Sequence, residues 1–145
     1  MRAKALNQDT RHNLRHLWIK CMFEFASPVL QRKWKAGDLH IIVTFDDCMG
    51  DYFETANLGE GLEWAVQSRL FAPSEVEIIA DFHGLAEAYN EPSNGDVVRD
   101  PNWSKIVDAA QKAWSSLRAV IEAPSEQKLM DELEERRGRI SNGPS

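Results

Sequence analysis

The sequence lacks the features that define membrane, disulfide-bonded and nucleic-acid-binding proteins. It has no run of 18 apolar residues, and its most apolar stretch, residues 39–45, is too short to span a bilayer. It contains two cysteines, Cys21 and Cys48, which form no CxxC pair, so we expect free thiols in a reducing cytoplasm. The net charge of −6 argues against binding to nucleic acid or to an anionic membrane, because both need dense Lys and Arg.

Motifs that would name a reaction are also missing. Neither GxSxG nor SxxK occurs, and Gly59-Glu60-Gly61 lacks the pattern of a phosphate-binding loop. Cys48 directly follows Asp47, whose charge disfavours a reactive thiolate. No internal repeat is visible. We therefore expect no catalytic residues and no cofactor.

What the sequence does contain is a segregated charge. Residues 1–36 carry eight Lys or Arg and two Asp or Glu, whereas residues 37–100 carry fourteen acidic residues and two basic ones. Residues 101–145 hold seven of each sign. A surface field of one sign attracts partners of the opposite sign, so the acidic middle block predicts a basic partner.

Hydrophobic spacing predicts an all-α fold, an orthogonal bundle of four to six helices. The segment 39–45 is β-branched and fits either one short strand or a helix. We expect a flexible N-terminus at 1–10, a single helical domain at 11–137 and a disordered tail at 138–145. Residues 46–61 are expected to form a loop, with or without one helical turn, because glycines and an asparagine punctuate them.

The helix boundaries follow from capping signals. The first helix is expected to begin at Asp9 or Thr10, and a later one at the capping-box pair Ser74 and Glu77. Asp100 followed by Pro101 marks the start of the best-specified helix. The core positions of the helix at 75–90 are predicted to be Ile78, Phe82, Leu85 and Tyr89. Those of the helix that follows Asp100 are Trp103, Ile106, Val107, Ala110, Trp114, Leu117 and Ile121.

The candidate binding site is the acidic loop and the start of the helix after it. Carboxylates select a basic partner, and aromatic residues beside them supply contact area, a combination that suits a protein interface. The spacing of the acids does not match a calcium-binding loop, so no metal is expected there. The predicted partner-binding residues are Asp46, Asp47, Asp51, Tyr52, Glu54, Glu60, Glu63 and Trp64.

These observations predict a non-catalytic domain that binds a basic protein. Small size, acidity and the lack of catalytic motifs are shared with bacterial immunity proteins and antitoxins, which neutralise basic toxins such as nucleases. The analogy is one of size and composition and rests on no shared motif. The expected partner is a basic protein, for which a toxin domain is one example.

Two alternatives remain open. Glu60 and Glu63, with Glu77 and Asp81, resemble in form the ExxE and ExxD motifs of all-α nucleotide pyrophosphohydrolases, which are metal-dependent. The second pair departs from that spacing, and only Arg69 stands nearby to bind phosphate. The other alternative is a homodimer, in which the basic N-terminal helix packs on the acidic middle block. His12 and His16, one helical turn apart, are expected to be an exposed pair without a function.

Overall fold

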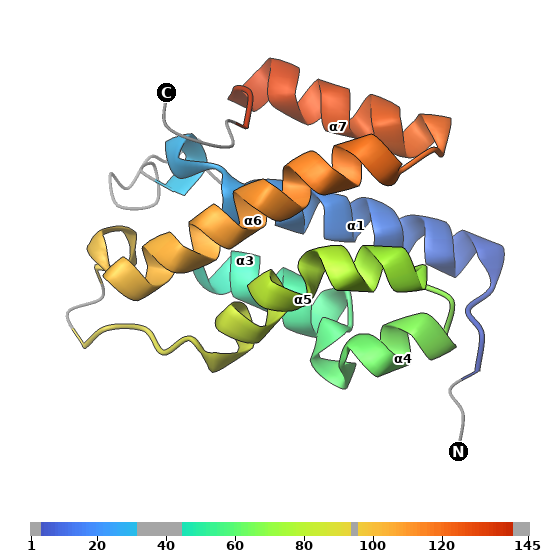
Figure 1. Cartoon of the computed structure of the whole chain (residues 1–145), viewed down its shortest axis with the longest axis horizontal. Helices are drawn as coiled ribbons and strands as arrows, with labels where there is room; N and C mark the ends of the chain where they lie inside the picture. Colours follow the sequence, from blue (N-terminus) through green and yellow to red (C-terminus); the bar gives the residue numbers. More distant parts are fainter. Residues whose placement is uncertain (1–3, 32–44, 94–95, 141–145) are drawn as a thin grey trace.

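The computed structural model describes residues 4–31, 45–93 and 96–140, which form an all-α bundle and contain no strand. The predicted all-α fold is therefore confirmed, whereas most of the segment 39–45 lies outside the described residues. Helices are labelled as in Figure 1: α1 (Gln8–Ala26), α3 (Phe45–Gly50), α4 (Leu62–Gln67), α5 (Pro73–Ala88), α6 (Pro101–Val120) and α7 (Pro124–Arg137). Shorter turns are the π-helical η1 (Asp51–Thr55) and the 3₁₀ turns η2 (Leu58–Glu60) and η3 (Val97–Arg99).

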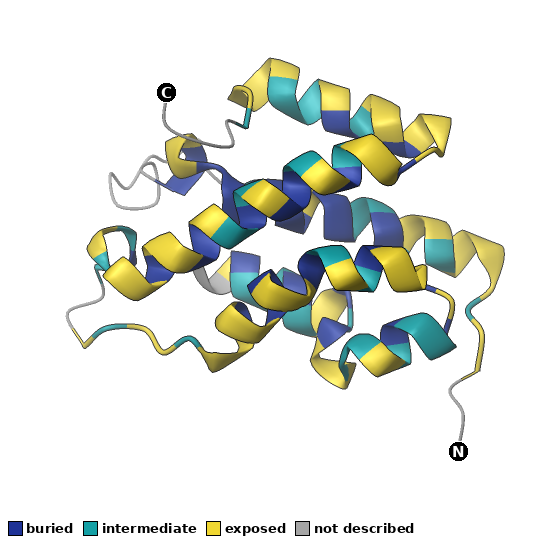
Figure 2. Ribbon diagram, viewed as in Figure 1, coloured by how far each residue is buried: buried dark blue, intermediate teal, exposed yellow. Residues whose placement is uncertain are grey.

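Helix α1 is the central element of the bundle. Its C-terminal half is apolar except on the side that carries Lys20 and Glu24, so other elements must cover most of its surface. It contacts α3, η1, α6 and α7, and the buried positions in Figure 2 concentrate on it and on the faces turned towards it. Its buried apolar residues are Trp18, Ile19, Cys21, Met22, Phe23, Phe25 and Ala26. None of the described helices has both the length and the apolar character that crossing a membrane requires.

Phe25 lies where four elements of the bundle meet. Its ring centroid is 4.8 Å from that of Phe82, 5.6 Å from that of Tyr52 and 5.7 Å from that of Trp103. These contacts join α1 to α5, η1 and α6. Aromatic pairs of this kind each contribute about 0.5–1.5 kcal/mol beyond the burial of their area.

Gln31 closes the C-terminal end of α1. Its side-chain amide donates to the carbonyl oxygens of Glu24 and Phe25 at 2.9 and 2.8 Å, and its Oε1 accepts from Trp103 Nε1 at 2.9 Å. The last carbonyls of a helix otherwise lack partners within it. The side chain of Gln31 therefore both caps α1 and fixes it to α6.

The predictions for α6 and α1 differ in outcome. Helix α6 starts as predicted, with the Asp100 carboxylate accepting from Asn102 N at 3.1 Å, and every residue of its predicted core face is buried. The cap of α1 was misplaced, because Asn7 Oδ1 accepts from Thr10 N at 2.8 Å. Both Asp9 and Thr10 therefore lie inside the helix.

The expected loop at 46–61 is wrong, because most of these residues are in helical turns. Three residues spaced by four are fully buried and hold this helical face against the core: Cys48, Tyr52 and Ala56. Tertiary burial of one face stabilises short helices that local propensity disfavours. The chain turns at Asn57 and Gly61, whose φ angles of 68° and 96° are left-handed. The glycine and asparagine signals located these breaks but not the helical turns between them.

Helix α5 starts earlier than predicted and is rotated. It begins at Pro73, and Glu75 rather than Glu77 closes its first turn by accepting from Ala72 N at 2.8 Å. Ile79, Phe82 and Ala86 are fully or almost fully buried, whereas Leu85, a predicted core residue, is 40% exposed. Of the other predicted core positions, Ile78 and Tyr89 are half-buried.

A buried ion-pair cluster fixes this rotation and joins α1, α5 and α7. The guanidinium of Arg15 donates to both carboxylate oxygens of Glu75 at 2.9 and 2.7 Å, and to both of Glu126 at 2.8 and 2.9 Å. Its fifth N–H donates to Leu70 O at 2.9 Å, so every donor of the side chain is used. Arg15 is 3% exposed, and its guanidinium carbon lies 5.4 Å from the ring centroid of Trp18.

The hydrogen bonds of this cluster outweigh the cost of burying its charges. Burial alone would lower the pKa of Arg15, but its bonds to Glu126 and Glu75 raise that pKa above the ordinary value. Burial would raise the pKa of Glu126, and the bond from Arg15 reverses the shift, so the net pKa lies below the ordinary value. Arg15 and Glu126 are therefore both charged at neutral pH.

The two glutamates belong to a tetrapeptide that occurs twice. Ala72-Pro73-Ser74-Glu75 opens α5 and Ala123-Pro124-Ser125-Glu126 opens α7. In both, proline is the first helical residue and glutamate lies in the first turn, where the helix dipole favours a carboxylate. Four residues later, Ile79 and Met130 are buried. The expectation of no internal repeat is therefore wrong, and this short repeat marks both partners of Arg15.

We predict that Arg15→Met lowers the free energy of unfolding by about 3–5 kcal/mol, because it leaves two buried carboxylates without a cation. The triple variant Arg15→Met, Glu75→Gln, Glu126→Gln should recover most of this loss, because it removes the charges together. Denaturant unfolding followed by circular dichroism at pH 7 measures both. A loss below about 1 kcal/mol in the single variant would contradict the prediction.

The matched control is Arg118→Met. Arg118 Nη2 lies 2.6 Å from Asp131 Oδ1, and the Asp131 side chain is 62% exposed. An ion pair this open to solvent contributes about 0–1 kcal/mol, so its loss should be small.

Candidate functional site

The predicted binding residues belong to a segment without positive charge. Residues 45–67, which we call the acidic segment, carry six Asp or Glu and no Lys, Arg or His. The segment runs from α3 through η1 and η2 to the end of α4. In Figure 1, α3 and α4 lie on the side of the bundle opposite α7. The backbone of the acidic segment therefore lies on one side of the bundle.

Most of the predicted acidic side chains reach solvent. Those at positions 47, 54, 60 and 63 are exposed, and Asp51 is half-buried. Trp64 is also half-buried and packs against the core from the surface of α4. The side chain of Asp46 lies outside the part of the chain that the structure describes.

The carboxylates of the acidic segment are poorly compensated by cations. Within the described residues, Asp51, Glu54, Glu60 and Glu63 form no ion pair. Glu63 accepts one hydrogen bond, from the amide of Gln67 at 3.1 Å. Among the other described carboxylates, Glu75, Glu126 and Asp131 do form ion pairs with arginine. The acidic segment therefore presents charge that the described chain does not neutralise.

Tyr52 does not belong to this surface. Its side chain is 0% exposed, and its hydroxyl lies 2.8 Å from His83 Nδ1. Because His83 Nε2 faces Glu87 at 3.5 Å, the Tyr52 hydroxyl donates and Nδ1 accepts. The prediction that Tyr52 contacts a partner is wrong, because its ring anchors η1 in the core.

Burial keeps this tyrosine–histidine pair uncharged. It raises the pKa of Tyr52 well above the ordinary value and lowers the pKa of His83, an effect that Glu87 opposes. His83 therefore has a structural role in the core. Its hydrogen bond ties α5 to η1 and so holds the acidic segment on the bundle.

Glu24 adjoins the acidic segment, although it is not among the predicted site residues. Burial, reinforced by the charges of Asp51 and Asp47, raises its pKa to about 7, while Arg137 opposes the shift. The available signal was a single acidic residue within the apolar run at 21–26. The carboxyl group of Glu24 keeps its proton to near neutral pH chiefly because it is buried, and the negative charges of Asp51 and Asp47 add to this effect.

The two cysteines lie beside Glu24 and are unsuited to catalysis. Cys21 and Cys48 are free and buried. Burial, with the negative charge of Glu24, raises the pKa of both thiols. They stay protonated at physiological pH and act as small core residues.

The residues of the alternative hydrolase site do not form a metal site. Glu60 lies in η2, Glu63 in α4, and Glu77 and Asp81 in α5. In the described residues, no group of three or more His, Cys, Asp or Glu is placed to hold a metal ion.

The two N-terminal histidines stack on one another. The ring centroids of His12 and His16 are 4.1 Å apart. His12 is exposed, whereas His16 is half-buried, which differs from the expected exposed pair. Burial, helped by the charge of His12, lowers the pKa of His16.

No protein-family model, no curated protein and no solved structure matches the chain. Its function therefore has to be inferred from the site itself.

We predict that Glu24 makes stability fall as pH rises from about 4.5 to about 7. In this window the folded protein keeps a proton that the unfolded chain releases, so raising the pH favours unfolding. Glu24→Gln should remove this dependence and raise the free energy of unfolding at pH 8 by about 1–3 kcal/mol. Denaturant unfolding between pH 4.5 and 8 measures it.

The control is Glu54→Gln, which removes an exposed carboxylate from the same segment and should leave the pH profile unchanged. His16 and His83 add an opposite slope below their ordinary pKa, but they do so equally in every variant. The difference between wild type and Glu24→Gln therefore isolates Glu24. Parallel profiles for these two proteins would contradict the prediction.

Proposed function

We propose that the chain is a non-catalytic domain whose acidic segment binds a basic protein. The supporting observation is the lack of internal compensation: within the described residues, Asp51, Glu54, Glu60 and Glu63 have no ion-pair partner. Exposed charges of one sign raise the association rate with an oppositely charged surface. A basic partner supplies the cations that the segment lacks.

Trp64 gives this surface an apolar contact point. It is half-buried on α4, next in sequence to the exposed Glu63. Tryptophan is enriched among residues that dominate binding energy, and a surrounding rim of charge sets orientation and rate. The proposed contact set is Asp46, Asp47, Asp51, Glu54, Glu60, Glu63 and Trp64, without Tyr52.

Binding of the partner is coupled to the ionisation of the Glu24 carboxyl group. Its raised pKa reflects burial together with the nearby charges of Asp51 and Asp47. A Lys or Arg of the partner placed beside this group favours the ionised carboxylate, so Glu24 releases its proton on binding. Complex formation near neutral pH is then accompanied by proton release into the buffer.

More specifically, the chain acts as an inhibitor that covers the active site of a basic enzyme. Carboxylates in such a complex take the places of nucleic-acid phosphates, as in the analogy with immunity proteins and antitoxins. The exposed positions of Glu54, Glu60 and Glu63 support this form, since they leave the carboxylates free to reach into a basic cleft.

We predict that Glu54→Gln, Glu60→Gln and Glu63→Gln together weaken binding of the basic partner about tenfold. Each exposed ion pair contributes about 0.2–1 kcal/mol, and 1.4 kcal/mol corresponds to a factor of ten. The tagged chain is used to capture partners from a lysate at low salt, and the captured basic protein is purified for titration. Its Kd should rise with salt for the wild type and less steeply for the variant.

The matched control replaces Glu122, Glu132 and Glu135 by Gln, which changes the net charge equally but outside the acidic segment. A basic protein retained by wild type and control but released by the triple variant supports the proposal. Retention of the same proteins by all three, or of none, contradicts it.

A further inference from the structure

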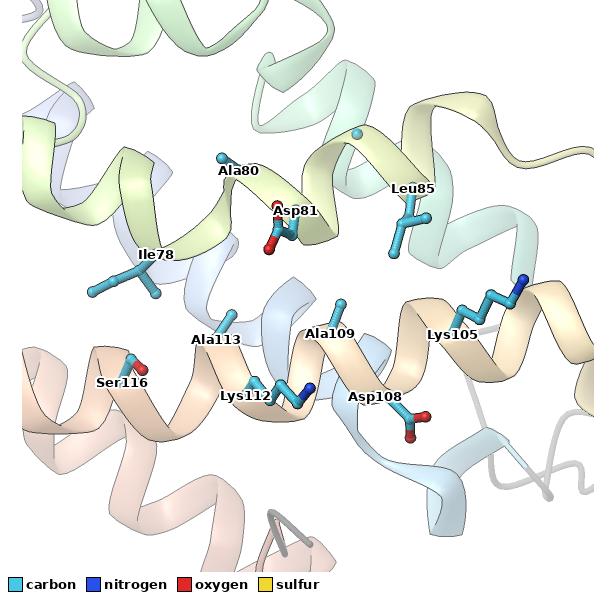
Figure 3. Close-up of a pocket in the computed structure, with 11 residues that line it drawn as sticks. Ile78, Ala80, Asp81, Leu85, Lys105, Asp108, Ala109, Lys112, Ala113 and Ser116 are labelled. Carbon is cyan, nitrogen blue, oxygen red and sulfur yellow. The ribbon is translucent and has the colours of Figure 1, made fainter.

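A groove on the outer surface separates α5 from α6. It encloses about 670 Å³ and is open to solvent. Figure 3 shows Ile78 and Leu85 on the α5 wall facing Ala109 and Ala113 on the α6 wall. Leu85 is 40% exposed, one of the most exposed large apolar side chains among the described residues. The groove is therefore lined by both apolar and charged side chains, and its Leu85 is not covered by the described chain.

Helix α5 carries a row of small residues beside this groove, which we call the ridge. Ala80, Gly84 and Ala88 are spaced by four residues, and all three are exposed. A Cβ atom built on Gly84 would meet nothing within 4 Å beyond the helix's own nearby backbone, so no close packing inside the described chain requires this glycine. Glycine weakens a helix interior relative to alanine, and its use is close approach by another backbone.

Charges of both signs border the groove in equal number. Figure 3 shows Asp81 on the α5 wall and Lys112 on the α6 wall at the same level along the groove, with Asp108 and Lys105 further along α6. All four side chains are exposed, and none forms an ion pair within the described residues. This border is neutral overall, in contrast to the acidic segment.

We propose that this groove is the contact face of a homodimer. A two-fold axis parallel to the groove places α5 of each copy over α6 of the other. Residues that lie at the same position along the groove within one copy then face each other across the dimer. Asp81 of one copy then meets Lys112 of the second copy, and the symmetry repeats the contact. Leu85 of each copy packs against the α6 wall of the other beside the ridge at Gly84.

Charge favours a second copy over a foreign partner. The chain carries a net charge of −6, so two copies repel each other through their acidic surfaces. The border charges of the groove sum to zero, and Asp81 and Lys112 complement each other under two-fold symmetry. A strongly acidic or basic partner gains nothing from such a border. The proposal does not depend on the acidic segment, which lies outside the groove.

The test is the mass of the protein in solution, followed by sedimentation equilibrium over a concentration series. The wild type should reach twice 16.5 kDa. Asp81→Lys and Lys112→Asp, made separately, place like charges together at two symmetric contacts, so each should weaken the dimer by about tenfold or more. The double variant Asp81→Lys, Lys112→Asp restores opposite charges and should return the Kd to near the wild-type value.

Two further variants separate docking from folding. Glu122→Lys makes the same change of net charge as Asp81→Lys outside the groove, and the dimer should persist. The chain itself leaves space at Gly84, so the side chain added by Gly84→Leu blocks the second copy without a clash inside the fold. This variant should therefore be a monomer with an unchanged or higher melting temperature. A wild type that stays monomeric at every concentration, or a charge swap that fails to restore the dimer, overturns the proposal.

Discussion

A single buried guanidinium sets how three of the long helices meet. Arg15 cannot be desolvated unless all of its donors are satisfied, and the structure meets this demand with two bidentate carboxylates and one carbonyl. Each carboxylate lies in the first turn of a helix that a proline begins. The requirement therefore fixes the start and the rotation of α5 and α7 relative to α1. Apolar packing alone tolerates small rotations of a helix, whereas a planar bidentate pair does not.

The surface features follow from this rotation. With Glu75 turned inward, Ile79, Phe82 and Ala86 enter the core, and Leu85 is left outside beside Gly84. The same turn of α5 directs His83 towards Tyr52 and so anchors η1. The exposed groove and the attachment of the acidic segment therefore both depend on an ion-pair cluster at the first turn of α5.

The sequence predicts helix boundaries and buried faces well where local signals are sufficient. Helix α6 has an aspartate cap, a proline in its first turn and an unbroken apolar stripe, and its start and face were both correct. The predictions are wrong where contacts between residues far apart in the sequence determine the structure. The rotation of α5 depends on Arg15, which lies 60 residues away from Glu75, and no local pattern records that contact. The helical turns after residue 45 form because Cys48 and Tyr52 are buried, despite glycines that suggest a loop.

The candidate site divides in the same way. Glu54, Glu60 and Glu63 lie in a stretch whose only nearby cation is Arg69, and their exposure agrees with this composition. Tyr52 and Glu24 could not be placed from their sequence neighbours, since the first is buried by α5 and the second borders the site from α1.

The Arg15 cluster also has a consequence for biosynthesis. Glu126 is translated 111 residues after Arg15, so until α7 has been made the nascent chain lacks one of the two carboxylates that bind the guanidinium in the complete fold. Completion of the fold is thereby tied to the synthesis of its last described helix.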